Sequence, residues 1–134
     1  MDKTLNLYEG RWKRRELRKF KKQRIERGFA DSDWWSMDHY LLLLIPAMLE
    51  TFMQQSKGVV ADDSPCFDDD NIPMEELLAV RNDILKQMIT HFKCATEALE
   101  KSWTADSAHN MEIADTEMKL GFDLLKEHIW KLWY

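Results

Sequence analysis

The chain has 134 residues, of which 45% are hydrophobic and 32% charged, and its formal net charge is −5. This length supports one hydrophobic core, and the composition is that of a globular chain, not a disordered one. The N-terminus lacks the apolar segment of a signal peptide, and the longest apolar run, residues 40–49, is about half of what a membrane span needs. We therefore expect a single cytoplasmic domain over residues 1–134, with no membrane insertion and with Cys66 and Cys94 as reduced thiols.

The charges are unevenly distributed along the chain. Residues 9–28 contain ten Lys or Arg and three Glu, a net charge of +7. The remaining residues contain nine Lys or Arg and 21 Asp or Glu, a net charge of −12. A strongly basic segment therefore precedes an acidic one.

The scarcity of turn-forming residues predicts long helices. Only four Gly and three Pro occur, whereas a fold of many short strands would need more turns. We expect an all-α bundle of four main helices, with a basic first helix over about residues 7–27 and a core over residues 28–134. A thin apolar stripe predicts that the first helix rests on the core without being enclosed by it, and Gly28 ends it.

The second predicted helix begins at Ser32 or Asp33 and continues to about residue 55. Its apolar residues occur on every face, which predicts the most buried and central element of the fold. Pro46 lies inside it, lacks an N–H and clashes with the preceding turn, so we expect a kink or a break near residues 42–44. A β-strand over residues 41–45 is the competing interpretation, which is disfavoured because leucine is a poor strand former and no partner strand is evident.

Two long helices are predicted to close the chain as an antiparallel hairpin. After the irregular, aspartate-rich segment 56–73, an amphipathic pattern runs for about 30 residues from Pro73 to Trp103. The last helix follows residues 104–107 and carries a seam with heptad-like spacing, in which Gly121 permits a close approach of the two helices. The seam residues are Met111, Ala114, Met118, Gly121, Leu125, His128 and Leu132.

No catalytic or metal-binding pattern is present. The aspartates of segment 62–71 lack the alternating order, the glycine and the final glutamate of an EF-hand. No Glu-x-x-His pair occurs, the histidines are isolated, and the sequence contains no Walker, G-x-G-x-x-G or G-x-S-x-G motif. We expect no catalytic residue, no metal and no cofactor; a hydrolase with an unrecognised carboxylate or histidine site stays as an alternative.

The basic first helix is the candidate functional feature. Clustered Lys and Arg with interleaved aromatics can neutralise phosphates and stack on bases, so a nucleic acid or a nucleotide is the predicted ligand. A protein partner, or pairing with the acidic remainder of the chain, would explain the same charges. The predicted anion-binding residues are Arg11, Lys13, Arg14, Arg15, Arg18, Lys19, Lys21 and Lys22.

The C-terminal segment is a candidate interaction surface. Trp130, Trp133 and Tyr134 lie with other apolar residues in one and a half helical turns, which is more apolar surface than one helix face can turn inward. We expect self-association or contact with a partner here. The alternative is that Trp130 and Trp133 cover the end of the core.

Three segments resemble a family of small uncharacterised proteins encoded by bacteriophages. They are the "GFADSDWWSMDHYLLLLIPAMLETF" segment with its W-S-[LM]-D entry and I-x-P helix, the "NDILKQMITHFK" helix, and the closing "GFDLLKEHIWKLWY" helix. The likeness covers roughly residues 28–56 and 82–134, and the basic first helix is its less typical part. The resemblance implies a helical fold and a phage or prophage source, but no chemistry. Small phage proteins commonly bind host machinery or sequester a signal, so a counter-defence factor or a protein inhibitor is expected.

Overall fold

The computed structural model describes residues 13–56 and 73–132, and every regular element within these ranges is helical. The elements are α1 (Arg14–Arg27), α2 (Asp31–Trp35), α3 (Met37–Gln55), α4 (Met74–Ser102), α5 (Ser107–His128) and the 3-10 turn η1 (Ile129–Lys131). The all-α prediction is confirmed, and residues 41–45 are helical and not a strand. The predicted start of the first helix and most of the irregular segment lie outside the described residues.

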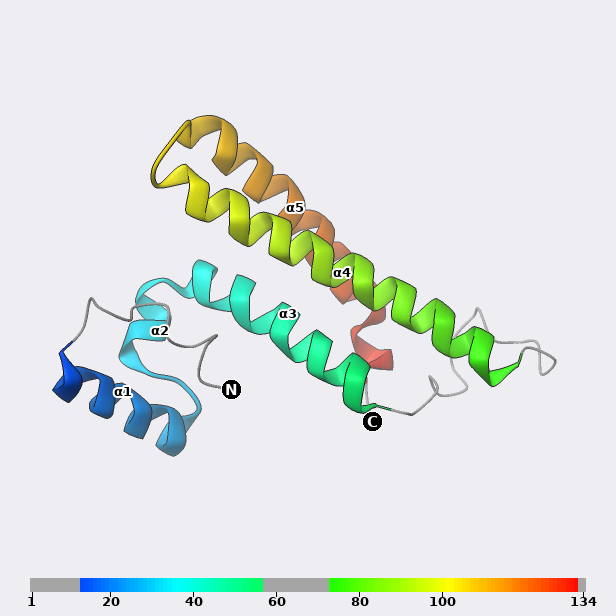
Figure 1. The fold of residues 1–134 in the computed structure, drawn as a ribbon, viewed down its shortest axis with the longest axis horizontal. Helices are drawn as coiled ribbons and strands as arrows, with labels where there is room; N and C mark the ends of the chain where they lie inside the picture. Colours follow the sequence, from blue (N-terminus) through cyan, green and yellow to red (C-terminus); the bar gives the residue numbers. More distant parts are fainter. Residues whose placement is uncertain (1–12, 57–72, 133–134) are drawn as a thin grey trace.

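The long helix α4 lies between α3 and α5, and both neighbours run antiparallel to it (Figure 1). The largest fully buried side chains are Leu85, Met88 and Phe92, and all three belong to α4. The sequence favoured the Pro46 helix as the most buried element. In the structure α4 holds that place, because it is covered on two sides. The predicted hairpin of the last two long helices is confirmed.

The helices α4 and α5 approach closely at Gly121. A Cβ built on Gly121 would lie only 3.1 Å from the ring of Phe92, so the missing side chain permits the approach, as the sequence predicted. Phe92 also meets Phe122 edge to face, with ring centroids 5.1 Å apart. The seam of α5 faces α4 at Ala114 and Gly121, whereas Met111, beside the hairpin turn, is 44% exposed.

The predicted second helix is interrupted ten residues earlier than Pro46. The break between α2 and α3 occurs at Ser36, whose backbone has φ −133° and ψ 61°. From there α3 continues through Pro46 without a break to Gln55, so the alternative of two helices divided near residues 42–44 is not observed.

A side chain from α4 compensates for the hydrogen bond that Pro46 cannot make. In a regular helix, the N–H of residue 46 would donate to the carbonyl of Leu42, but proline has no N–H. The hydroxyl of Thr96 lies 3.0 Å from the Leu42 oxygen and 2.9 Å from the Phe92 oxygen. Thr96 is buried, so this contact satisfies a carbonyl that water does not reach and joins α3 to α4.

Helices α1 and α2 form a separate layer at one end of the molecule (Figure 1). Phe20 is the buried residue of α1 and meets Trp35 of α2 edge to face at 6.1 Å. This agrees with the thin apolar stripe predicted for the first helix. Within the described ranges, no helix is long and apolar enough to cross a membrane.

Replacing Thr96 by Val should destabilise the fold through the Leu42 carbonyl. We expect the variant to lose about 1–3 kcal/mol of unfolding free energy, because a buried acceptor loses its donor. In a Pro46→Ala background, the restored N–H of residue 46 takes over that acceptor, and the same substitution should cost clearly less. Chemical denaturation of the four proteins of this double-mutant cycle measures the difference.

The exposed Thr51 provides the control for this cycle. Its hydroxyl donates to the Ala47 carbonyl at 2.9 Å within α3, and Thr51→Val should change the unfolding free energy by no more than about 0.5 kcal/mol. An equal cost of Thr96→Val in both backgrounds would contradict the role assigned to Pro46.

Candidate anion-binding site

The cations of α1 divide into two groups, according to whether they face α2. Arg24, Arg27 and Lys19 face α2 and lie within 4.0 Å of its carboxylates. The chain reverses direction at Gly28, whose φ of 86° suits glycine, and this places α2 back along α1. These three cations therefore hold the two short helices together.

The strongest contact of this layer is a two-pronged ion pair between Arg24 and Asp33. The Arg24 Nε donates to one carboxylate oxygen at 3.0 Å, and its Nη2 donates to the other at 2.6 Å. The Asp33 carboxylate also accepts from the backbone N–H of Ala30 at 2.7 Å. Asp33 is 5% exposed, so its charge depends on these donors, and removing one would leave a buried charge uncompensated.

The Asp31 carboxylate of α2 is contacted by three side chains of α1. Gln23 Nε2 donates to it at 2.8 Å and Arg27 Nη2 at 2.5 Å, while Lys19 Nζ lies 3.3 Å away. The hydrogen bond from Gln23, then those from Arg27, Lys19 and Trp34, hold the pKa of Asp31 well below its usual range. The carboxylate thus stays ionised and links both short helices.

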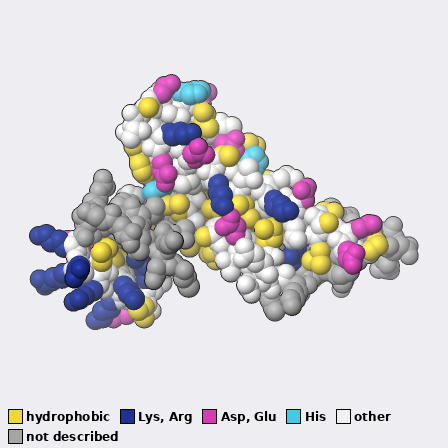
Figure 2. Space-filling view, viewed as in Figure 1, with side chains coloured by type: hydrophobic (Ala, Val, Ile, Leu, Met, Phe, Trp, Pro, Cys, Tyr) yellow, Lys and Arg dark blue, Asp and Glu magenta, His cyan; other side chains and the backbone are white. Residues whose placement is uncertain are grey.

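The second group of cations points away from the protein. Arg14, Arg15, Arg18 and Lys21 are exposed, as is Lys13, and none of their charged groups lies within 4.0 Å of a carboxylate among the described residues. Figure 2 shows these Lys and Arg side chains gathered at the end of the molecule that carries α1. Lys22 pairs with Glu26 at 3.5 Å, but both are exposed, so this pair adds little to stability.

The start of α1 concentrates positive potential further. The N-terminus of a helix carries partial positive charge, which favours an anion and disfavours the neighbouring Arg14 and Arg15. Glu16 is the only acid in the first turn, and its carboxylate accepts from the Lys13 backbone N–H at 3.0 Å. This end of α1 can therefore attract an anion.

The structure brings most of the predicted anion-binding residues onto one helix. Lys13, Arg14, Arg15, Arg18, Lys21 and Lys22 share its exposed sides, while Lys19 also contacts Asp31. Arg11 lies outside the described residues. Among the described carboxylates, those of α3, α4 and α5 make no ion pair with α1, so its charges are not paired with those acidic helices.

The C-terminal candidates are placed only in part. Trp130 lies in η1 and is 89% exposed, so it does not cover the core. Its neighbour Ile129 is 49% exposed. Trp133 and Tyr134 lie outside the described residues.

A buried arginine in α4 was missed by the sequence reasoning. Arg81 is 6% exposed, and its guanidinium donates to the Ser56 hydroxyl and carbonyl, both at 3.2 Å. It also lies over the ring of Phe52, and burial lowers its pKa. Its position four residues after Leu77 and four before Leu85 in an apolar stripe was the available signal. Arg81 therefore connects α4 to the C-terminal end of α3 through hydrogen bonds to Ser56.

Two histidines, His91 and His39, each contact one carboxylate of another helix. His91 Nδ1 lies 2.6 Å from Glu117, and the buried His39 places Nε2 3.0 Å from Glu100 and its ring against Trp103. Within residues 13–56 and 73–132, no three or more His, Cys, Asp or Glu side chains are grouped so as to hold a metal ion. These pairs join helices and form no triad.

Comparison with known proteins gives no relative for this chain. A scan against protein-family models, a search of the curated proteins and a search of the solved structures each found no significant match. The function is therefore inferred from the residues and their geometry.

The low pKa of Asp31 makes the α1–α2 contact sensitive to acid. At about pH 7, an Asp31→Asn variant should melt below the wild-type chain, because it loses the ionised acceptor. The folded chain resists protonation of Asp31, whereas the unfolded chain takes up the proton at its ordinary pKa of 3.8. The difference in melting temperature should therefore shrink as the pH falls below about 4.

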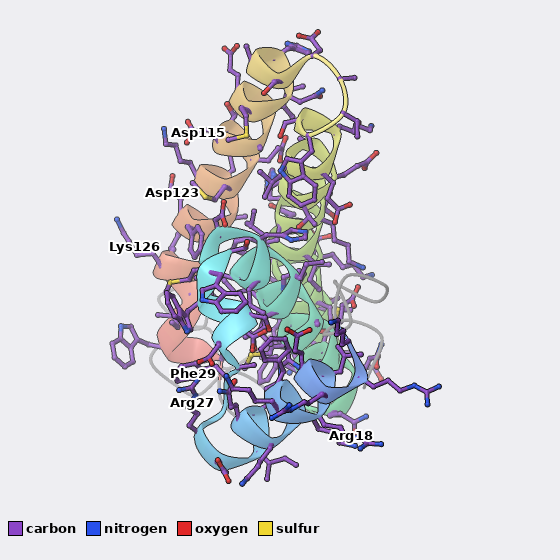
Figure 3. All side chains as sticks on the ribbon, turned by 90° about the vertical axis from the view of Figure 1, so that its left-hand side faces the viewer. Arg18, Arg27, Phe29, Asp115, Asp123 and Lys126 are labelled. Carbon is purple, nitrogen blue, oxygen red and sulfur yellow. The ribbon has the colours of Figure 1, made fainter. Side chains whose placement is uncertain are left out.

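The exposed Asp123 of α5, labelled in Figure 3, serves as the control. It makes no ion pair with another described residue, and Asp123→Asn should leave the melting temperature close to that of the wild type at each pH. The contrary result is a difference in melting temperature between wild type and Asp31→Asn that stays constant from neutral to acid pH. That result would rule out the role of the Asp31 charge.

Proposed function

We propose that this chain is a non-enzymatic binding protein that holds an anionic ligand, a nucleic acid or a nucleotide, through the exposed cations of α1. The observation that carries the proposal is the division of the charges on α1. Three cations are used to attach the helix, and five others face solvent without a nearby carboxylate among the described residues. Folding does not require the second group, because exposed charges add little to stability.

The spacing of the exposed cations suits a chain of phosphates. Arg14, Arg18 and Lys21 are three or four residues apart, so they are neighbours on one side of the helix. From Arg14 to Lys22 the helix rises about 12 Å, at about 1.5 Å per residue. A row of this kind follows a phosphate backbone better than it encloses one small anion, which favours a nucleic acid over a nucleotide.

The biological setting follows from the resemblance to small bacteriophage proteins. A phage or prophage protein with a nucleic-acid-binding helix would act in the cytoplasm of the host bacterium as a counter-defence or host-takeover factor. This part of the proposal rests on the sequence motifs of residues 28–56 and 82–134. The basic helix is the less typical part of that resemblance.

Removing three exposed arginines should weaken binding without unfolding the protein. For the combined substitution Arg14→Gln, Arg15→Gln and Arg18→Gln, we expect the affinity for an oligonucleotide to fall by at least about tenfold at physiological salt. The log–log dependence of affinity on salt should flatten by about 2 units, because each lost phosphate contact removes about 0.7 to 0.9. Fluorescence anisotropy at several salt concentrations measures both quantities.

A matched variant removes the same charge from another surface. Lys86, Lys119 and Lys126 are exposed on α4 and α5, and their combined replacement by Gln should leave the affinity within about twofold. The melting temperature of the arginine variant should stay within about 2 °C of wild type. The proposal fails if the wild-type chain binds no nucleic acid. It also fails if the arginine variant and the lysine variant lose affinity equally.

A second candidate function, contact with another protein, is supported by the exposed end of α5. Trp130 and Ile129 form an apolar patch in water, and a large exposed tryptophan is a common anchor of protein interfaces. A second copy of this chain is the simplest partner, and a host protein inhibited by the chain is the alternative.

Self-association through this patch predicts that Trp130→Ala shifts the oligomeric state. The wild-type chain should form a dimer in the micromolar range, and the variant should need at least about thirtyfold more protein, as expected for an anchor residue. Size-exclusion chromatography with light scattering measures the mass. Wild-type protein that remains monomeric throughout that range would eliminate the self-association.

A further inference from the structure

An exposed tryptophan lies in α2, the short helix that packs on the basic helix α1. Trp34 of α2 is 54% exposed, although its ring meets that of Trp35 edge to face at 6.0 Å. Trp35 in turn meets the buried Phe20 of α1 at 6.1 Å. The three rings form a series that runs from the interior of the α1–α2 layer to solvent. Trp34 thus offers an exposed aromatic face beside a second indole, Trp35, which is 52% exposed.

The same tryptophan shares a carboxylate with a cation of α1. The Trp34 side chain helps to keep the pKa of the Asp31 carboxyl low, and Lys19 Nζ lies 3.3 Å from Asp31 Oδ2. Lys19 is four residues after Arg15 and three before Lys22, so these three cations are neighbours on one side of α1. A flat aromatic surface and a row of cations thus border each other.

A second aromatic ring lies at the end of the same layer. Phe29 is 44% exposed, and the guanidinium carbon of Arg27 lies 4.6 Å from its ring centroid. Figure 3 shows Arg27 beside Phe29, whereas Arg18 lies toward the other end of the helix. Arg27 also donates to Asp31, so the arginine ties this ring to the carboxylate that Trp34 and Lys19 contact.

We infer that the anionic ligand of α1 is a single-stranded nucleic acid, one base of which stacks on Trp34 while the adjoining phosphates contact the exposed Arg15 and Lys22, on the same side of α1 as Lys19. The inference rests on the proposed function and names its ligand class. A row of cations alone would serve duplex and single strand alike. The exposed indole discriminates between them, because an unpaired base can offer its face to an aromatic ring, whereas a base within a duplex is already stacked on both sides.

The test compares a single strand of about 15 nucleotides, near the upper site size of single-strand-binding folds, with a duplex of the same length. For Trp34→Ala we expect the affinity for the single strand to fall about 5- to 150-fold, the range measured for the loss of one stacked base. Affinity for the duplex should change by less than about twofold. The wild-type chain should bind the single strand more tightly than the duplex at equal salt.

Two further variants separate stacking from the attachment of α2. Trp34→Phe keeps an aromatic ring but removes the indole N–H, and should retain most of the affinity for the single strand. Trp103, which follows the C-terminal end of α4, is 62% exposed, and Trp103→Ala provides the matched control that should bind like wild type. Melting temperatures of the three variants report on the fold.

The outcomes distinguish this inference from the proposed function. One outcome is that Trp34→Ala lowers the affinity for single strand and duplex equally, or changes neither affinity, while the triple arginine variant still loses affinity. In that case stacking is overturned and the proposed function stands. If the wild-type chain binds polyglutamate of matched charge as tightly as the single strand, the partner is an acidic protein surface and the inference is overturned. If the chain binds no nucleic acid, both are overturned.

Discussion

The ion pair between Arg24 and Asp33 sets the arrangement on which the rest of the basic helix depends. Asp33 is buried and accepts from both prongs of Arg24 and from the Ala30 backbone, so α1 has a single way to lie on α2. That orientation turns Phe20 inward and leaves Arg14, Arg18 and Lys21 in water. The cations that are clustered in the sequence therefore also lie together on one surface. Such a surface can attract a polyanion.

The rest of the fold is organised around α4, which α3 and α5 cover from two sides. Its partners are held by different means. Gly121 lets α5 approach the ring of Phe92, and Thr96 and Arg81 reach polar backbone groups of α3 and its end. Buried polar contacts of this kind fix the register between helices more sharply than apolar packing does, because a shift would leave the donors and acceptors unsatisfied. The α1–α2 layer is attached to this framework at its end and can present its cations to a long ligand.

Positive charge and aromatic surface contribute differently to binding a nucleic acid. The cations supply affinity that depends on salt and is indifferent to strand number, whereas an exposed ring supplies affinity that salt affects little and that requires an unpaired base. The α1–α2 layer has exposed cations and an exposed ring, and under the proposed function their two contributions can be measured separately in one small protein. The carboxylate at their junction also limits how far Lys19 can turn toward a phosphate.

The sequence by itself determined the helical class, the hairpin of the last two long helices, the close approach at Gly121 and the identity of the basic segment. These follow from local periodicity, from the scarcity of glycine and proline, and from charge counts, which depend on no distant residue. The tertiary structure decided which cations are used for attachment, that Pro46 stays inside an unbroken helix, and that Arg81 is buried. Each depends on a partner far away or across a turn: Asp31 and Asp33 for α1, Thr96 for Leu42, and Ser56 for Arg81. Periodicity cannot reveal such partners, because a hydrogen bond between helices leaves no repeat in either one.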